Sequence, residues 1–275
     1  MTLSRSDVKN LLAQHGLSPS RALGQNFVVD PNTVRRIAKL AGVSSGDHVL
    51  EIGAGLGSLT LALIETGATV KAVELDRYLL PVLRDQVEPL GVVVVEGDAM
   101  ELDWPEVLAD SDEWTLVANL PYNVSTPLVL TLLDNVPQIK RMLVMVQLES
   151  GERLVAEKGS KAYGIPSVKV AYWASAKLVG KVPPSVFVPR PKVDSALVEI
   201  VRREQPATTA DPERLFALVR AGFAHRRKML RGALGDLVKL EDFEKAEVSP
   251  QARAEELSVE DWGRLAGLIS RDQNE

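Results

Sequence analysis

Short apolar runs alternate with amphipathic stretches through the first half of the chain. Such runs are typical of strands that are buried on both faces, and the stretches between them have the apolar spacing of helices. The expected strands are residues 49–52, 69–74, 91–95, 114–118 and 141–146, and the expected helices are 59–64, 77–87 and 127–134. This alternation predicts an α/β fold, a Rossmann-like doubly wound sheet that binds its ligand at the carboxyl ends of the strands.

The pattern changes after about residue 180. Four prolines crowd into residues 183–191, where no helix interior could tolerate them. Helical patterns then follow near residues 212–234 and 259–269. We therefore predict two domains, a ligand-binding domain over residues 1–183 and a smaller, mainly helical domain over residues 184–275.

A glycine-rich turn follows the first predicted strand. Gly53, Gly55 and the glycine at position 57 let the backbone turn tightly and approach a ligand. The dinucleotide fingerprint would place its third glycine at position 58, where this chain has serine. Glu74 ends the second strand and Asp98 follows the third, so carboxylates are available for ribose hydroxyls and an adenine amino group. Together these features favour a nucleoside ligand over a nicotinamide dinucleotide or a plain strand-to-helix turn.

Asn119, Leu120, Pro121 and Tyr122 follow the fourth predicted strand directly. The side-chain carbonyl of Asn119 and the main-chain carbonyl of Leu120 can accept both hydrogens of an adenine amino group, which would aim the nitrogen lone pair at a methyl group. Pro121 keeps Leu120 out of the α region and so fixes the direction of its carbonyl. The Tyr122 ring can stack on the base, which is worth about 1–3 kcal/mol. In isolation these residues would suit an ordinary proline turn; one strand after Asp98, they favour catalysis by alignment.

The net charge of −5 hides a segregation of charge along the chain. Residues 1–139 carry a net charge of −9, residues 140–231 a net of +10 and residues 232–275 a net of −6. A basic block between two acidic ones can attract a polyanion locally. The candidate RNA-binding residues in that block are Arg220, Arg226, Arg227, Lys228 and Arg231. A solvated helix face and contact with RNA phosphates are both open interpretations of this cluster.

Composition excludes several other classes of site. The chain has no cysteine, and its three histidines (His15, His48 and His225) are widely scattered, so we expect no disulfide framework and no metal site. No apolar run approaches the roughly 20 residues that span a bilayer, and the first residues lack a targeting pattern. We expect a cytoplasmic protein with no membrane partner, and a monomer by default.

The glycine turn, the acidic strand ends and the Asn-x-Pro-Tyr motif together resemble amino-group adenine methyltransferases. A fuller set of segments resembles the ribosomal RNA adenine dimethyltransferases of KsgA type. These segments are residues 24–27, 119–127, 160–164, 183–187, 191–196 and 226–228. The resemblance implies S-adenosylmethionine as cofactor. It also implies dimethylation of two adjacent adenosines near the 3′ end of small-subunit (16S) rRNA, within an assembling 30S-type particle.

The resemblance also implies roles for individual residues. It implies that the cofactor is contacted by Asn26, the main chain at Val28, Gly53, Gly55, Glu74, Asp98 and Asn119. It further implies that Phe187 faces Tyr122 across a flipped adenine, although Phe187 alone would suit a core aromatic. Leu148 stands where relatives commonly place lysine, so an RNA contact is not carried over to that side chain.

Two alternatives remain beside the small-subunit dimethyltransferase. One is a large-subunit rRNA adenine methyltransferase of the antibiotic-resistance type, and the other is a non-catalytic RNA-binding assembly factor. Residues 124–127 and 160–164 favour the small-subunit target. Intact Asn119 and Tyr122, with Glu74, argue against a loss of activity.

Overall fold

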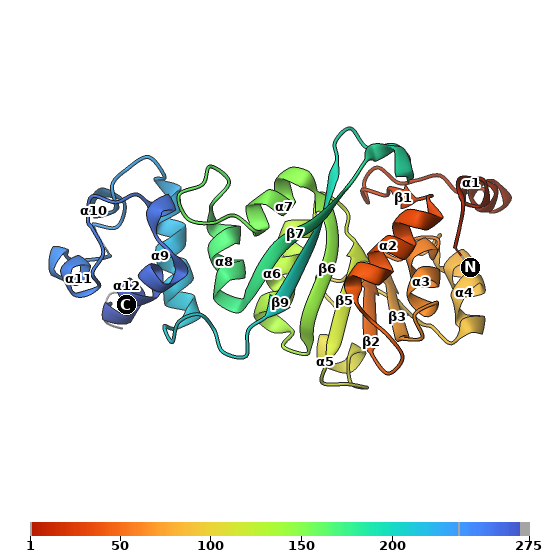
Figure 1. Cartoon of the computed structure of the whole chain (residues 1–275), viewed down its shortest axis with the longest axis horizontal. Coiled ribbons are helices and arrows are strands. Elements are labelled where there is room, and N and C mark those ends of the chain that lie inside the picture. The colour runs from red at the N-terminus through yellow and green to blue at the C-terminus, as the bar shows by residue number, and fades with distance from the viewer. Residues whose placement is uncertain (1, 236, 270–275) are drawn as a thin grey trace. The chain divides into compact units, whose positions relative to one another are not determined.

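The chain forms two compact units, each with its own hydrophobic core, in a computed structural model that describes residues 2–235 and 237–269 (Figure 1). Unit 1 comprises the chain up to residue 151 together with residues 177–202. Unit 2 comprises residues 152–176 and the chain from residue 203 onward.

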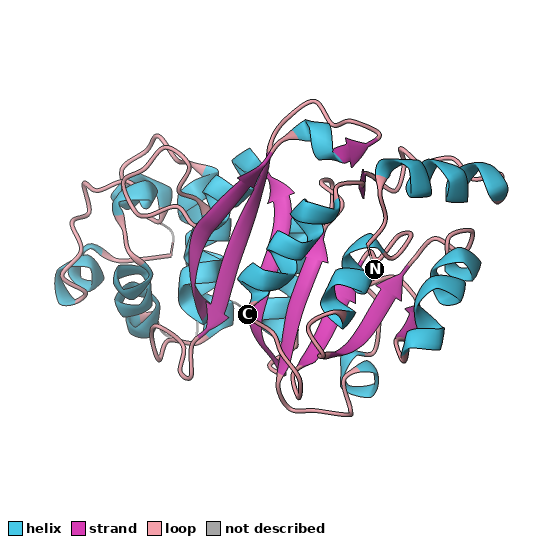
Figure 2. Cartoon of the chain, turned by 45° about the vertical axis from the view of Figure 1, so that its right-hand side comes forward, coloured by secondary structure: helices cyan, strands magenta, loops and turns pink. Residues whose placement is uncertain are grey.

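Unit 1 is built on a seven-stranded sheet of order β4-β3-β2-β5-β6-β9-β7. Its strands are β2 (His48–Ile52), β3 (Thr69–Glu74), β4 (Val93–Glu96), β5 (Trp114–Asn119), β6 (Ile139–Gln147), β7 (Ala174–Val182) and β9 (Ser195–Arg202). Strands β2 to β6 pair in parallel, and β9 joins β6 antiparallel. Helices cover both sides of the sheet (Figure 2), which confirms the doubly wound α/β fold. A separate two-stranded ladder pairs β1 (Phe27–Val28) with β8 (Phe187–Val188).

Helix α2 of unit 1 shows recognisable capping chemistry at both ends. In α2, the side chain of Asp30 accepts a bond from the Thr33 amide, Pro31 occupies the first turn, and left-handed Gly42 ends the helix. The helical elements are α1 (Arg5–Gln14), α2 (Pro31–Ala41), α3 (Ser58–Ile64), α4 (Leu80–Val87), η1 (Glu88–Leu90), α5 (Trp104–Val107), α6 (Ser125–Asn135), α7 (Leu148–Leu154) and η2 (Pro184–Val186). The last turn of α7 extends into unit 2.

Unit 2 packs short helices around a core that includes the fully buried Trp262. Its elements are α8 (Ile165–Trp173), α9 (Pro212–Ala224), α10 (Leu230–Ala233), α11 (Leu240–Lys245), η3 (Ala254–Glu256) and α12 (Val259–Leu268). None of the helices in the described part of the chain combines the length and apolarity that a bilayer crossing needs.

The predicted continuous helix over residues 212–234 is wrong. Helix α9 ends at Ala224, and His225 leaves helical geometry with φ −120° and ψ 47°. A turn closed by a 2.7 Å bond from the Lys228 amide to the His225 carbonyl then leads to α10. The basic run at residues 226–228 therefore lies in a turn and not on a helix face.

The division of the chain also differs from the predicted boundary after residue 183. The proline-rich residues 183–191 lie within unit 1, because β7 and β9 on either side of them extend the sheet beyond β6. Helix α8 belongs instead to unit 2, where Val168 and Tyr172 are buried in the core. Unit 2 is thus assembled from two segments that are separate in sequence.

One arginine ties the last residue of β9 to the carbonyls at the end of α6. The guanidinium of Arg202 donates to the main-chain oxygens of Leu132, Leu133, Val136 and Ile139 at 2.9–3.2 Å. The carbonyls of Leu132 and Val136 also accept from the main-chain amides of Val136 and Ile139, so the guanidinium adds a charged donor to the bonds at the end of the helix.

We expect Arg202→Met to lower the free energy of unfolding by about 3 kcal/mol, because several partly buried carbonyls would lose a charged donor. Chemical denaturation of the full chain measures this loss. Arg203→Met is the control, since Arg203 is exposed and its Nε donates to the Ala171 carbonyl alone at 3.2 Å. Similar losses in both variants would show that the bonds of Arg202 add no particular stability.

Candidate active site

One cavity of unit 1 lies where the carboxyl ends of β2, β3 and β5 come together. Its walls include residues 22–28 near the amino terminus, the turn after β2 and residues 97–100 after β4. It brings together the predicted cofactor residues and all but one of the predicted catalytic residues: Asn26, Val28, Gly53, Gly55, Glu74, Asp98, Asn119, Leu120, Pro121 and Tyr122. Phe187 is not among the lining residues.

The turn after β2 depends on glycine. Gly53, Gly55 and Gly57 have φ values of 76°, 61° and 86°, a left-handed conformation that other residues rarely adopt. At Gly55 there is also no room, because an added Cβ would lie 3.0 Å from the Phe27 ring. The turn therefore brings its main chain against the cavity with no side chain in the way.

Two carboxylates on neighbouring strands face the cavity with fixed orientations. Glu74 Oε2 accepts from the Gly55 amide at 2.7 Å, and Glu74 Oε1 accepts from the Asp76 amide at 2.8 Å. Burial raises the pKa of Glu74, and these amide bonds oppose the rise. Asp98 Oδ1 accepts from the Met100 amide at 2.9 Å. Each carboxylate oxygen can accept more than one bond, so acceptor positions remain for a ligand.

Glu51 is a site residue that the sequence analysis missed. Its side chain is 2% exposed and lines the cavity, and its Oε2 has no hydrogen-bond partner among the described residues. The buried hydroxyl of Ser58, on the same wall, also lacks a partner there. Burial raises the pKa of Glu51 to about 8, and the nearby charge of Glu74 adds to the rise. A buried carboxyl with a free oxygen suits a positively charged ligand group.

The amide of Asn119 has a defined orientation. Its Nδ2 donates to the main-chain carbonyl of Asn26 at 3.0 Å. The side-chain oxygen is then the part of the amide that can accept a bond from a ligand. Leu120 follows with its side chain buried and its amide bound to the Met145 carbonyl at 3.1 Å. Within the described chain, no donor reaches the Leu120 carbonyl. Two neighbouring oxygens are thus available as acceptors.

The amino-terminal wall of the cavity is held by side-chain bonds. Gln25 Oε1 accepts from the Ser20 amide, and Gln25 Nε2 donates to Asp76, each at 2.7 Å. Gly24 allows this segment to approach Pro121, since a Cβ at Gly24 would lie 3.3 Å from the Pro121 Cβ. The segment that carries Asn26 therefore sits directly against the catalytic corner.

Tyr122 is partly buried and is held at both ends. Its hydroxyl lies 2.7 Å from the hydroxyl of Ser195, and its main-chain carbonyl accepts from Ser125 Oγ at 3.3 Å. Burial raises the pKa of Tyr122, so the phenol stays protonated at neutral pH. Tyr122 is one of the residues that line the cavity.

Phe187 is buried in unit 1. It belongs to β8, paired with Val28 of β1, and its side chain is fully buried in the hydrophobic core. In this structure it packs as a core aromatic, and a base between Phe187 and Tyr122 would require the Phe187 ring to move.

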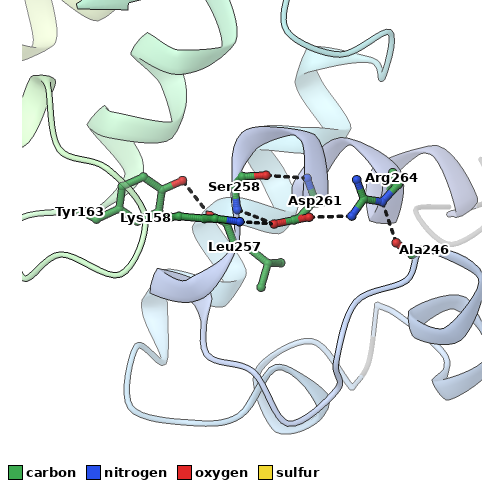
Figure 3. Close-up of polar contacts among 7 residues, drawn as sticks. All are labelled: Lys158, Tyr163, Ala246, Leu257, Ser258, Asp261 and Arg264. Carbon is green, nitrogen blue, oxygen red and sulfur yellow. Dashed lines mark hydrogen bonds and ion pairs between the residues drawn. The ribbon is translucent and has the colours of Figure 1, made fainter. Parts of the chain in front are cut away.

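Several cations of unit 2 are engaged in internal ion pairs. Lys158 and Arg264 both contact Asp261, which also accepts from the Ser258 amide at the start of α12 (Figure 3). Arg264 donates further to the Ala246 carbonyl at 2.7 Å. Two cations thus share one carboxylate, and these contacts hold the start of α12 in place within unit 2.

The predicted RNA-binding residues divide into two groups. Arg226 pairs with Glu255 at 2.6 Å and donates to the Lys161 carbonyl at 2.9 Å, so its guanidinium is committed within unit 2. Side chains that are exposed and have no ion pair among the described residues form the other group: Arg220, Arg227, Lys228 and Arg231. The bond from Arg226 also brings Lys161 beside the basic turn.

The site fits a nucleoside that carries positive charge. Buried carboxyls at Glu51 and Glu74 suit a cation, and the glycine turn leaves space for a ligand against the main chain. No group of three or more potential metal ligands occurs among the described residues. Fold and site together define an S-adenosylmethionine-dependent methyltransferase.

Two solved structures have the same fold over most of their length. A dimethyladenosine transferase from Plasmodium falciparum has a TM-score of 0.74 and 25% identity, covering 86% of this chain and 94% of its own. The 23S rRNA methyltransferase ErmE has a TM-score of 0.68 and 24% identity, covering 88% and 98%. At that identity, the likeness to ErmE concerns the fold alone.

Sequence comparison identifies the family. The model of the ribosomal RNA adenine dimethylase family matches residues 17–271. A Bifidobacterium adolescentis protein named ribosomal RNA small subunit methyltransferase A is 45% identical over 97% of this chain and 94% of its own length. A protein of the same name from Kineococcus radiotolerans is 48% identical over 96% and 90%. The chain belongs to the ribosomal RNA adenine dimethylase family.

The raised pKa of Glu51 predicts a pH dependence of stability in the cofactor-free protein. Between about pH 4.5 and 8 the folded protein keeps a proton on Glu51 that the unfolded chain releases, so stability falls as pH rises. Glu51→Gln lacks this proton. We therefore expect the free energy of unfolding of Glu51→Gln, relative to that of the native protein, to increase between pH 5 and 8.

Urea denaturation at several pH values measures the difference. The exposed Glu101→Gln is the matched control, and it should follow the pH profile of the native protein. Parallel profiles for Glu51→Gln and the native protein would mean that Glu51 is already ionised in the folded, cofactor-free state.

Proposed function

We propose that this protein transfers methyl groups from S-adenosylmethionine to the amino groups of two adjacent adenosines near the 3′ end of small-subunit rRNA. Relatives that carry the small-subunit name match almost the whole chain, which supports this target. The observation that carries the chemistry is the orientation of Asn119, whose amide nitrogen is bound to Asn26 and whose oxygen is left to accept.

Asn119 and Leu120 act on the adenosine amino group. The nitrogen of that group is a weak nucleophile, because its lone pair is delocalised into the ring. The Asn119 side-chain oxygen and the Leu120 carbonyl accept its two hydrogens, which favours a pyramidal nitrogen with its lone pair directed at the methyl group. The bond from Asn119 to Asn26 fixes the first acceptor in advance, so little reorganisation is needed.

Tyr122 holds the base in place. Its ring stacks on the flipped adenine, and Pro121 keeps the preceding carbonyl in a fixed direction. The remaining catalysis is alignment of the nucleophile with the methyl group and its leaving group. Phe187 has no part in this arrangement while it stays buried in the core.

The cofactor would be held by the residues on the other walls of the cavity. When bound, S-adenosylmethionine supplies a methyl group on a positively charged sulfur. Glu74 would accept the ribose hydroxyls, Asp98 the adenine amino group, and Glu51 would balance positive charge. Asn26, Val28, Gly53 and Gly55 would line the remainder.

The large-subunit alternative is not favoured, because the full-length relatives carry the small-subunit name. A purely structural assembly factor would have no use for the aligned acceptors at Asn119 and Leu120.

Incubation with labelled cofactor and immature small subunits, followed by nucleoside analysis, tests the proposal. Label in dimethyladenosine of the small-subunit RNA supports it. Label only in large-subunit RNA, or binding without transfer, refutes it.

Unit 2 would bind the RNA through its unpaired cations. Arg227 and Lys228 are exposed in the turn after α9, and Arg220 and Arg231 flank that turn. The substrate would be the assembling 30S-type particle in the cytoplasm, engaged by a monomer.

We expect Asn119→Ala to lower kcat on immature small subunits by about 100-fold or more, because one of the two acceptors that align the amino group is lost. Single-turnover assays with labelled cofactor measure the rate. Asn135→Ala, at the exposed end of α6, is the control and should keep the native rate. An unchanged rate in folded Asn119→Ala would remove the basis of the proposed chemistry.

Reversing the charges of Arg227 and Lys228 together should weaken binding to small-subunit RNA and reduce its salt dependence by about one to two counterions. Cofactor affinity should stay unchanged, since neither residue lines the cavity. Filter binding over a range of salt concentrations, with calorimetry for the cofactor, measures both. Arg226→Glu should instead destabilise unit 2, because it breaks the pair with Glu255. If the charge reversal at Arg227 and Lys228 also lowered cofactor affinity, the assignment of RNA binding to these cations and of cofactor binding to the cavity would be contradicted.

A further inference from the structure

The hydroxyl of Tyr122 meets a buried serine from a strand that the proposed chemistry does not use. Ser195 is the first residue of β9, and its side chain is fully buried. The two hydroxyl oxygens lie 2.7 Å apart.

Ser195 is itself rigidly placed. It pairs with Gln147 at the end of β6, and the carbonyl of Asp194 accepts from the Leu148 amide at 3.0 Å. These contacts fix the main chain on both sides of the serine. A hydroxyl held in this way is a suitable anchor for a side chain whose exact orientation affects a reaction.

Stacking by itself does not need the hydroxyl of Tyr122, because a phenylalanine ring has the same face. The main chain of Tyr122 is already held by the bond from Ser125 Oγ and by a 3.2 Å bond from the Val124 amide to the Pro121 carbonyl. The bond to Ser195 restrains the opposite end of the ring. Together these bonds leave the ring little freedom to rotate or tilt.

We propose that Ser195 is a positioning residue, which sets the plane of the Tyr122 ring and thereby the direction from which the adenine presents its amino group. This inference rests on the proposed role of Tyr122 in stacking on the base. A ring free to tilt would still bind the base, but it would present the amino nitrogen in the reactive orientation for a smaller fraction of the time. The loss would therefore fall on kcat more than on KM or on cofactor affinity.

Three variants test the proposal on immature small subunits at saturating cofactor: Ser195→Ala, Tyr122→Phe and the double variant. Each single change should lower kcat by about five- to tenfold, the effect of one net hydrogen bond, with the cofactor Kd unchanged. The double variant should be no slower than either single variant, because both remove the same bond. The two substitutions should also be coupled in stability. The double variant should lose less free energy of unfolding than the sum of the two single losses, since removing both hydroxyls leaves no buried group unpaired.

Ser167→Ala is the matched control for loss of a buried serine. Ser167 is 2% exposed, and its hydroxyl donates to the Arg153 carbonyl in unit 2. This control should lower stability without lowering kcat. Ser195→Thr keeps the hydroxyl, and where it folds it should recover rate relative to Ser195→Ala.

The outcomes distinguish a failure of the positioning role of Ser195 from a failure of the stacking role of Tyr122. If Tyr122→Phe slows transfer and folded Ser195→Ala does not, the positioning role of Ser195 is wrong while the role of Tyr122 stands. Rate losses that multiply in the double variant would also overturn it, because the two hydroxyls would then act separately. If Tyr122→Ala leaves kcat and KM unchanged, stacking by Tyr122 fails, and the inference fails with it.

Discussion

The catalytic corner depends on one hydrogen bond between residues far apart in sequence, from the Asn119 amide nitrogen to the Asn26 carbonyl. An asparagine amide offers a donor on one side and an acceptor on the other, and nothing in β5 alone decides which side faces the cavity. The amino-terminal segment determines the orientation, because its Asn26 carbonyl accepts the bond from the amide nitrogen of Asn119. The same segment is tied to Asp76 through Gln25, so the wall of the cavity and the orientation of the Asn119 amide are set by one piece of chain.

The remainder of the cavity is notable for two buried carboxyl groups. Glu51 and Glu74 both lie at the carboxyl ends of adjacent strands, and burial raises the pKa of each. Holding such groups ionised without a partner is unfavourable. A cationic ligand group beside these carboxyls would offset this cost, and a neutral group would not.

Much of the framework could be predicted from apolar periodicity, because that pattern depends on local sequence. Strand β3 has the predicted bounds 69–74, and the predicted cofactor residues line one cavity. Features that depend on distant partners could not be read in this way. The burial of Phe187 follows from its pairing with Val28, and the pairing of Arg226 with Glu255 follows from the packing of unit 2. Glu51 was overlooked because a charged residue inside an apolar strand gives no periodic signal of its own.

Unit 2 takes α8 from one stretch of chain and α9 to α12 from another, with β7 to β9 of unit 1 between them. The core residues Val168 and Tyr172 therefore depend on partners such as Leu215 and Trp262 that are encoded downstream of the sheet. A gene fragment that stopped after β9 would leave the apolar face of α8 in water. A single crossover between two related genes within β7 to β9 would instead join α8 of one parent to α9–α12 of the other. The core of such a hybrid would pack only where the side chains of the two parents fit each other.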